Sequence, residues 1–221
     1  MPADRLRDPR ERRERATRIL DVAADLLLRH GYRRVTIDDV AAGANIGKGT
    51  VYLHWKTRED LFAAVFEREV REAIGELVRA LRRDPEECLP HGFARVYFLA
   101  IMRRPLLRGF VLADAALLGK LASHDSALDE RHRLVSIAYF GLLAEHGLLR
   151  DDLDAEAIGY AFQATFEGFL RAEADGPAPD ALERRADLLA QTVRRAFESG
   201  GAIPADVADA VIDAFAGLAE A

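Results

Sequence analysis

Cysteine is nearly absent from this chain of 221 residues, which contains only Cys88. A single cysteine excludes an intramolecular disulfide and a zinc site made of cysteines alone, and it fits the reducing cytoplasm. Long apolar runs are absent too, since none approaches the roughly 20 residues that a membrane-spanning helix requires. The N-terminus carries arginines without an apolar segment behind them, which is unlike a secretory signal. We therefore expect a cytoplasmic protein with no membrane partner.

Catalytic and metal-binding motifs are also missing. The six histidines form no H-E-x-x-H pattern, no G-x-S-x-G elbow occurs, and Cys88 belongs to no motif. His124 and His132 lie eight residues apart with aspartates nearby and could form a metal site between helices. Positions in a solvated loop and at a helix end explain this pair better. The sequence thus predicts no catalytic residue, no metal, no cofactor and no enzymatic activity.

Alternating apolar and polar residues, the pattern of a half-buried strand, do not occur in this chain. Apolar residues recur instead at spacings of three and four, which is the period of a helix. The predicted fold class is therefore all-α. Caps, glycines and prolines divide the chain into a short helix opened by Thr36 and further helices at about residues 10–29, 48–55, 57–83, 86–104, 106–123, 126–146, 154–174, 179–199 and 204–219.

Charge is distributed unevenly along the chain. The net charge is −6, but residues 1–58 contain 13 Lys and Arg against 8 Asp and Glu, a balance of +5. The remainder contains 18 basic and 29 acidic residues, a balance of −11. A basic end on an acidic body indicates that only the first segment meets a polyanion. The N-terminal arginines form either an arm over DNA or a solvated, disordered tail, and the sequence leaves both open.

The stretch AAGANIGKGTVYLHWKTREDLF, residues 41–62, is rich in glycine and invites a nucleotide-binding interpretation. A P-loop requires G-x-x-x-x-G-K-[ST] after a buried strand. If Gly47 and Lys48 are the G-K pair, Ala42 occupies the position of the first glycine and Gly49 that of the magnesium-binding hydroxyl. Helical spacing, not a strand, precedes the motif. The nucleotide-binding interpretation therefore fails.

The same stretch fits a helix-turn-helix. Thr36 and Asp39 form a capping-box variant that opens a short helix, and residues 43–47 supply a tight turn. In the second short helix, Val51 and Trp55 are spaced to face a core. The outward positions carry groups suited to phosphates and base edges, namely Lys48, Gly49, Thr50, Tyr52, Leu53 and His54.

The run GYRRVTIDDVAAGANIGKGTVYLHWKTREDLFAAV resembles the DNA-binding domain of the TetR family of transcriptional regulators. The resemblance implies an all-helical homodimer. Residues 1–56 would be a three-helix, helix-turn-helix DNA-binding domain with a basic N-terminal arm, and residues 57–221 a larger helical domain for effector binding and dimerisation.

The resemblance also implies the DNA-contacting residues: Thr36, Lys48, Gly49, Thr50, Tyr52, Leu53, His54, Lys56 and Arg58. The chain departs from the family pattern at Gly47, where a serine is common, and at Leu53, where an aromatic or polar residue is frequent. Two alternatives stay open, because Tyr52 could belong partly to the core and His54 could cap the C-terminus of its helix.

The acidic body contains a helix, residues 154–174, that is apolar on more than one side, which is typical of burial on two faces. One face would pack on the chain's own core and the other on a second copy in a four-helix bundle, unless the helix is fully internal. The predicted dimer residues are Ala157, Ala161, Ala164, Gly168, Leu182, Ala186, Leu189 and Val193.

Aromatic residues at helical spacing belong either to a core or to a pocket hollowed in it, and polar groups among them need partners that a ligand could supply. The residues predicted to bind an effector are Phe93, Tyr97, Met102, Phe110, Asp114, Tyr139, Gln163, Phe166 and Glu167. The sequence as a whole predicts a repressor that binds a palindromic double-stranded DNA operator as a homodimer and is released by a small-molecule effector. A helical small-molecule-binding dimer, for storage or catalysis and with a vestigial helix-turn-helix, is the alternative. Activation instead of repression also stays open.

Overall fold

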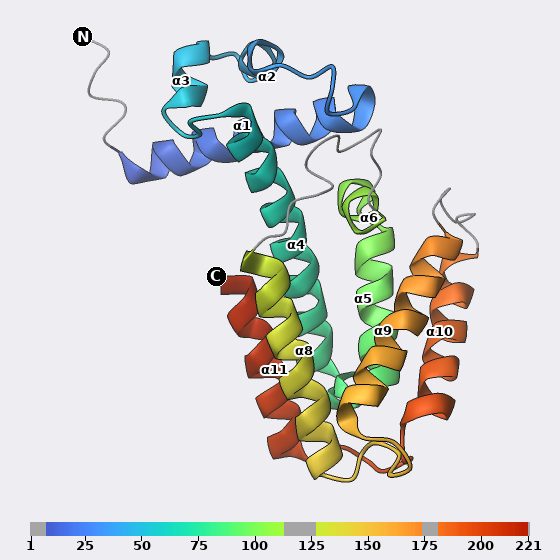
Figure 1. Ribbon diagram of the computed structural model, residues 1–221. Helices are drawn as coiled ribbons and strands as arrows, with labels where there is room; N and C mark the ends of the chain where they lie inside the picture. The colour runs from blue at the N-terminus through green and yellow to red at the C-terminus, as the bar shows by residue number, and fades with distance from the viewer. Residues whose placement is uncertain (1–7, 113–126, 174–180, 221) are drawn as a thin grey trace. The chain divides into compact units, whose positions relative to one another are not determined.

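The computed structural model describes residues 8–112, 127–173 and 181–220 (Figure 1). Within these ranges the chain forms helices and no strand, apart from an isolated β-bridge between Leu149 and Glu198. The predicted all-α class is confirmed. The elements are α1 (Pro9–His30), α2 (Ile37–Gly43), α3 (Lys48–Tyr52), α4 (Arg58–Arg83), the 3-10 helix η1 (Pro85–Cys88), α5 (Pro90–Met102), α6 (Pro105–Val111), α8 (Ala127–Glu145), α9 (Ala155–Ala172), α10 (Leu182–Phe197) and α11 (Ala205–Glu220).

The chain divides into two compact units. The N-terminal unit comprises residues 1–69 and 105–124, and the helical body comprises residues 70–104 and 125–221. Helix α4 belongs to both units, and α6 returns the chain to the first. The predicted boundary near residue 57 lies inside the N-terminal unit, because Leu61 and Phe62 of α4 and Leu106 of α6 join its core.

The N-terminal unit is organised around side chains that its helices bury completely. Ile19 and Leu27 of α1, Val40 of α2, Val51 of α3 and Phe62 of α4 have no exposed surface. Burying one such side chain stabilises the fold by about 1.5–3 kcal/mol, so these positions fix how α1 to α4 pack.

Turn residues define where the helices of this unit end. Gly31 follows α1 with φ 72°, a backbone conformation that favours glycine. Thr57 and Asp60 bond reciprocally at the start of α4, with both backbone-to-side-chain distances at 3.0 Å. These caps satisfy N–H groups that the first turn of a helix leaves without an internal partner.

Three predicted helix bounds are wrong. The helix predicted at residues 106–123 ends at Val111, and residues 113–123 of that range lie outside the described residues. The helix predicted from residue 86 to 104 is split, because Pro90 lacks an N–H and favours an extended residue before it. Leu89 is extended, with φ −70° and ψ 155°, so η1 ends before it and α5 begins after it. Helix α3 ends at Tyr52, three residues before the predicted end, and the chain then turns toward α4.

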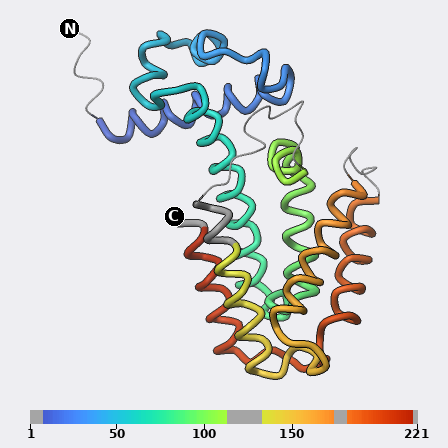
Figure 2. Tube along the Cα trace, viewed as in Figure 1, coloured from blue at the N-terminus to red at the C-terminus, as the bar shows by residue number. Residues whose placement is uncertain are grey.

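The helical body is arranged around α5. This helix packs on α9, α10 and η1, while α8 packs on α9 and α11. The trace in Figure 2 shows α8 beside α11 and α9 beside α10. Most of α5 is buried, which its apolar residues on nearly every side predict. Among the described residues, no helix combines the length and the apolar character that crossing a membrane requires.

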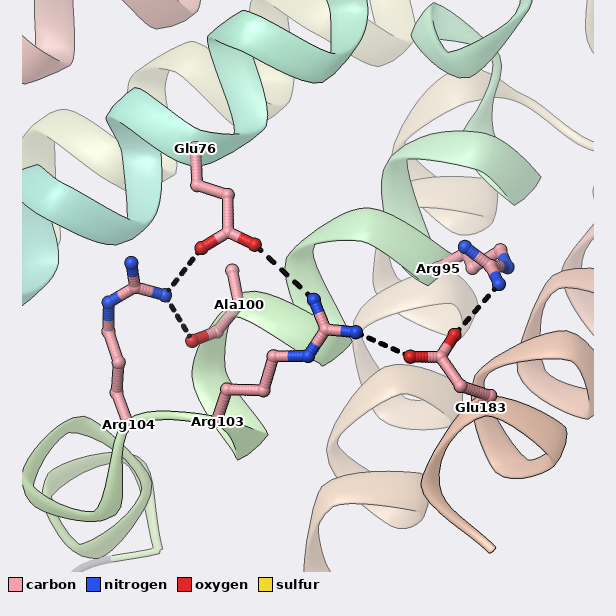
Figure 3. A network of polar contacts seen from close by, with 6 residues as sticks. All are labelled: Glu76, Arg95, Ala100, Arg103, Arg104 and Glu183. Carbon is pink, nitrogen blue, oxygen red and sulfur yellow. Dashed lines mark hydrogen bonds and ion pairs between the residues drawn. The ribbon is translucent and has the colours of Figure 1, made fainter. Parts of the chain in front are cut away.

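Ion pairs connect three helices of the body (Figure 3). Glu76 of α4 accepts a hydrogen bond from Arg104 at 2.8 Å and lies 3.6 Å from Arg103. Glu183 of α10 pairs in turn with Arg103, and with Arg95 of α5 at 3.0 Å. Single exposed ion pairs contribute little to stability. Here, however, two carboxylates each bridge two arginines, so the network ties α4, the end of α5 and α10 together.

Candidate functional site

The helix-turn-helix is built by a cap, a reversing residue and a buried anchor. The Thr36 hydroxyl accepts the backbone N–H of Asp39 at 3.2 Å, and the Asp39 carboxylate accepts the N–H of Thr36 at 2.8 Å. Asn45, with φ 53°, reverses the chain after α2. Val51 has no exposed surface and anchors α3 in the core. The opposite side of α3 is therefore held at the surface.

Five predicted DNA contacts lie together on that surface. Tyr52 is 44% exposed and Leu53 56%. Lys48 and Gly49 are exposed and Thr50 is half-buried. A Cβ atom added at Gly49 would meet no other atom within 4 Å, so the protein leaves this position open to a partner's backbone.

Lys48 is held by a carboxylate of the preceding helix. Its Nζ donates to Asp38 at 2.7 Å, and this hydrogen bond raises the pKa of Lys48. Both side chains are exposed, so the pair adds little stability. The contact instead positions a charged ammonium at the start of α3, where a phosphate can replace Asp38.

Two other predicted contacts lie at the edges of this surface. The Thr36 hydroxyl donates to Asp39 at 2.7 Å, and this bond lowers the pKa of the Asp39 carboxyl. The threonine is thus engaged within its own cap before any partner arrives. Lys56 is exposed in the turn before α4.

Arg58, predicted to contact a phosphate, points into the protein. Its Nε donates to the carbonyl of Val35 at 2.9 Å, and a terminal nitrogen donates to the carbonyl of Tyr32. The guanidinium lies 4.0 Å from the centroid of the Tyr32 ring, a cation–π geometry. The Tyr32 hydroxyl donates to Glu59 at 3.0 Å. We term Tyr32, Val35, Arg58 and Glu59 the Arg58 clamp, which joins the α1–α2 loop to the start of α4.

His54 is flanked by arginines of α1 that sequence reasoning did not connect with it. Burial lowers the pKa of His54, and the positive charges of Arg12 and Arg15 lower it further. Arg12 belongs to α1, which begins at Pro9, so it is helical and not part of a flexible arm. The helical spacing of Arg12 and Arg15 placed both on one side of α1, but only the tertiary packing brings that side to His54.

The predicted effector residues separate into two groups. Phe93, Tyr97, Tyr139 and Phe166 join one cluster of aromatic rings in the helical body. Met102 is buried at the end of α5. The remaining described residues lie elsewhere: Phe110 stacks on Phe66 in the N-terminal unit, and Gln163 is exposed and bonds to Glu167 at 3.0 Å on the surface of α9. Asp114 lies outside the described residues.

The predicted dimer residues differ in whether the structure leaves them accessible to a second copy. Ala157, Ala164 and Gly168 are exposed along α9, while Ala161 and Leu182 are half-buried. In contrast, Ala186, Leu189 and Val193 have no exposed surface, because α10 packs this side on α5 of the same chain. These three residues cannot contact a second copy. Sequence reasoning missed two exposed apolar residues of these helices, Tyr160 of α9 at 77% and Leu188 of α10 at 47%.

The chain is all-helical, and a short helix after a tight turn presents a lysine, a phenol and a hydroxyl group. These features define the class of helix-turn-helix DNA-binding regulators. Residues 19–65 match the family model of bacterial regulatory proteins of the tetR family. This N-terminal part of the chain is therefore similar to the DNA-binding domain of TetR-family regulators.

Individual relatives agree with this assignment. An HTH-type transcriptional regulator of Mycobacterium tuberculosis is 43% identical over 70 residues, which are 32% of this chain and 35% of that protein, so the match spans about a third of the relative's length. The HTH-type transcriptional repressor AcnR of Corynebacterium diphtheriae is 26% identical over 187 residues, 81% of this chain and 92% of that one. A TetR-family transcriptional regulator from Mesorhizobium loti has the same fold, with a TM-score of 0.62 at 21% identity over 85% of this chain and 98% of that one.

Proposed function

We propose that the protein is a ligand-responsive transcriptional repressor that binds a palindromic operator as a homodimer and releases it when a small molecule binds the helical body. The surface of α3 carries this proposal. Val51 anchors the helix in the core, while Lys48, Gly49 and Tyr52 remain at the surface. Backbone-positioning and base-reading contacts require such an anchored helix with donors at the surface.

In the proposed complex, α3 enters a major groove. Lys48, Thr50 and Tyr52 would contact phosphates and base edges, and Leu53 would contact a thymine methyl. Lys56, Thr36 and His54 would contact the flanking backbone. Two copies of α3 in successive major grooves, about 34 Å apart, require a palindromic site and a twofold dimer.

Helices α9 and α10 support the proposed dimer. Ala157, Ala164 and Gly168 give α9 an exposed face of small residues; Tyr160 is exposed on the same helix and Leu188 on α10. Small residues allow two helices to approach closely, and exposed large apolar side chains favour burial in a partner. Two copies of α9 and α10 would form a four-helix bundle across the twofold axis.

Release of the operator follows from the shared helix α4, which contributes Arg58–Glu69 to the N-terminal unit and Val70–Arg83 to the helical body. An effector that binds one conformer of the body more tightly shifts the population toward it. Operator affinity then falls by at most the effector's differential affinity for the two conformers. The similarity of this chain, over most of its length, to the transcriptional repressor AcnR favours repression.

A titration of operator DNA tests the proposal. We expect salt-sensitive binding of the dimer to a palindrome upstream of its own gene, measured by fluorescence anisotropy at fixed salt. Lys48→Ala should weaken binding about tenfold, since a good base or phosphate contact is worth about 1–3 kcal/mol. Arg82→Ala removes the same charge from an exposed position on the body's part of α4 and should bind like the wild type. Unchanged affinity of Lys48→Ala would remove this contact, and no salt-sensitive binding to any duplex would favour the small-molecule-binding dimer.

A further inference from the structure

Two arginines of α1 lie beside the end of the helix-turn-helix. His54 follows the last residue of α3 by two positions. Burial lowers the pKa of His54 first, and the positive charges of Arg12 and Arg15 lower it further. The three basic side chains are therefore close together in space, although α1 and α3 are distant in sequence. We term Arg12, Arg15 and His54 the α1 basic cluster.

The packing of α1 fixes where this cluster lies. Ile19 has no exposed surface, so its side of α1 faces the core. Val22 lies against α2, so closely that a Cβ atom added at Gly43 would be 2.6 Å from its Cγ1. Arg15 precedes Val22 by two helical turns and therefore lies on the same side of α1. Arg12, one turn earlier, is its neighbour on the helix surface. This flank of α1 thus faces the helix-turn-helix.

No acidic side chain offsets these charges in the part of the chain that the structure describes. There, neither Arg12 nor Arg15 forms an ion pair or a side-chain hydrogen bond. Glu14 of the same helix pairs with Arg10 at 3.1 Å, and Glu11, one turn before Arg15, forms no ion pair with it. Like charges held together without a counter-charge repel one another. An anion bound at the cluster would remove this repulsion.

The cluster borders the surface that the proposed complex places against DNA. Tyr52 and Leu53, which directly precede His54, are exposed on that surface. Lys48 lies at its other end, about 9 Å away along the axis at about 1.5 Å per residue. A duplex that receives α3 presents a row of phosphates along each edge of the groove. Phosphates are therefore the anions that come closest to the cluster.

From this arrangement we propose that Arg12 and Arg15 contact a backbone phosphate at the edge of the groove that α3 enters, next to His54. The inference rests on the proposed function and deepens it, because it adds two contacts from α1, outside the helix-turn-helix. A guanidinium offers several N–H donors to phosphate oxygens. Such contacts set the position and orientation of the protein on the duplex but do not read bases.

The helical setting of both arginines distinguishes this contact from that of a disordered arm. Arg12 is exposed and Arg15 is half-buried, and both belong to α1. Their backbone is ordered before DNA arrives, so binding loses less conformational entropy than the ordering of a free arm would. The contact should therefore be made on any duplex that α3 can approach.

The salt dependence of DNA binding tests the contact. Arg15→Gln should weaken operator binding of the full-length protein about three- to tenfold at physiological salt. It should also reduce the slope of log K against log salt by about 0.9, the value of one phosphate contact in B-DNA. Arg12→Gln should act in the same way. A duplex of unrelated sequence should lose affinity by a similar factor, because a phosphate contact carries no sequence information.

Arg13→Gln is the matched control. Arg13 is exposed on the same helix and, two residues from Arg15, points about 200° away from it. This variant loses the same charge and should keep the wild-type affinity and slope. Arg15→Lys keeps the charge and should keep most of the slope. Equal effects of Arg15→Gln and Arg13→Gln, or weaker binding of Arg15→Gln with an unchanged slope and a lower unfolding temperature, would overturn the proposal.

Neutral methylphosphonate, placed at one operator phosphate at a time, locates the contact. At the phosphate that Arg15 contacts, this substitution should weaken binding by the wild type and by Arg13→Gln severalfold. Arg15→Gln, which has already lost the contact, should change by less than about twofold there. Equal losses in Arg13→Gln and Arg15→Gln at every phosphate would show that Arg15 contacts none of them.

Wild-type titrations of both duplexes separate this inference from the proposed function. If the operator is bound and Arg15→Gln behaves like Arg13→Gln, the contact is wrong and the repressor function stands. If both duplexes are bound equally and only the cluster variants lose slope, the contact stands and operator recognition fails. If no duplex is bound, both fail.

Discussion

Arg58 shows how the surroundings of one residue decide between two functions. A cation at the start of α4 has the right position for a phosphate contact, but its guanidinium is committed to two carbonyls and to the ring of Tyr32. Only a planar fork with several donors can make these contacts together. The structure therefore gives Arg58 a role in holding the α1–α2 loop.

Substituting Arg58 distinguishes the two roles. Arg58→Ala should lower the free energy of unfolding by about 2–3 kcal/mol, because it removes charge-assisted hydrogen bonds and a cation–π contact. Arg58→Lys should recover only part of this loss. Urea unfolding followed by the fluorescence of Trp55, the only tryptophan, measures the free energy of unfolding of each variant. Lys56→Ala, two residues away and exposed, should leave stability unchanged. Weaker operator binding with unaltered stability in Arg58→Ala would restore the phosphate contact.

His54 should make operator binding depend on pH. In the folded protein the pKa of His54 lies below the ordinary histidine value of 6.5, first because the ring is buried and then because of the positive charges of Arg12 and Arg15. The fold therefore disfavours the protonated ring. The protein loses stability as pH falls below the pKa that His54 has in the unfolded chain. A phosphate beside the ring favours the protonated form, so binding takes up a proton and affinity rises as pH falls.

The measurement compares wild type with His54→Gln. Anisotropy titrations at constant salt, between about pH 7.5 and about pH 6 where histidine titrates, should show a severalfold gain in wild-type affinity. The gain should be smaller in His54→Gln. Identical pH dependence in both proteins would mean that His54 stays away from the phosphates.

At the scale of elements, α9 carries the proposed dimer contact on a face of small residues. Ala164→Arg places an unpaired charge at the centre of that face, and burying such a charge costs about 3–5 kcal/mol. We expect the dissociation constant of the dimer to rise about 100-fold or more, with operator affinity falling in parallel. Ala144→Arg, at an exposed position on α8, is the matched control and should remain dimeric. Sedimentation equilibrium measures the dissociation constant of the dimer for both variants. A dimeric Ala164→Arg would show that α9 is not the interface.

Helix α10 shows where sequence reasoning ends. Its apolar period predicts the stripe of Ala186, Leu189 and Val193 correctly, yet the period does not say whether a stripe meets its own chain or a second one. In the structure this stripe packs against α5 of the same chain. By contrast, the caps at Thr36 and Thr57 and the turn before α3 depend on neighbouring residues only, and these local features were predictable. Side-chain directions such as those of Arg58 and Gln163 depend on residues distant in sequence, which periodicity does not contain.

At the scale of the molecule, the chain passes between its two units at three points: within α4 after Glu69, between Arg104 and Pro105, and between residues 124 and 125. The charged network of the helical body includes a residue near each of the first two points. Glu76 lies two turns beyond the first, and Arg104 directly precedes the second; they are joined by a hydrogen bond of 2.8 Å (Figure 3). A displacement of α5 within the body is thereby shared with α4.

A double-mutant cycle measures this connection. For Glu76→Gln and Arg104→Gln we expect a coupling energy of about 0.5–1.5 kcal/mol in thermal unfolding, above that of most surface pairs, because Arg103 and Glu183 extend the network. Arg150 and Asp152 form an isolated, exposed pair at 2.6 Å and serve as the control, with coupling below about 0.5 kcal/mol. Since the network is ionic, its coupling should shrink in high salt. Equal coupling in both pairs would leave apolar packing as the only link between α4 and the end of α5, and an effector signal would then have to travel through the core and not through the charges.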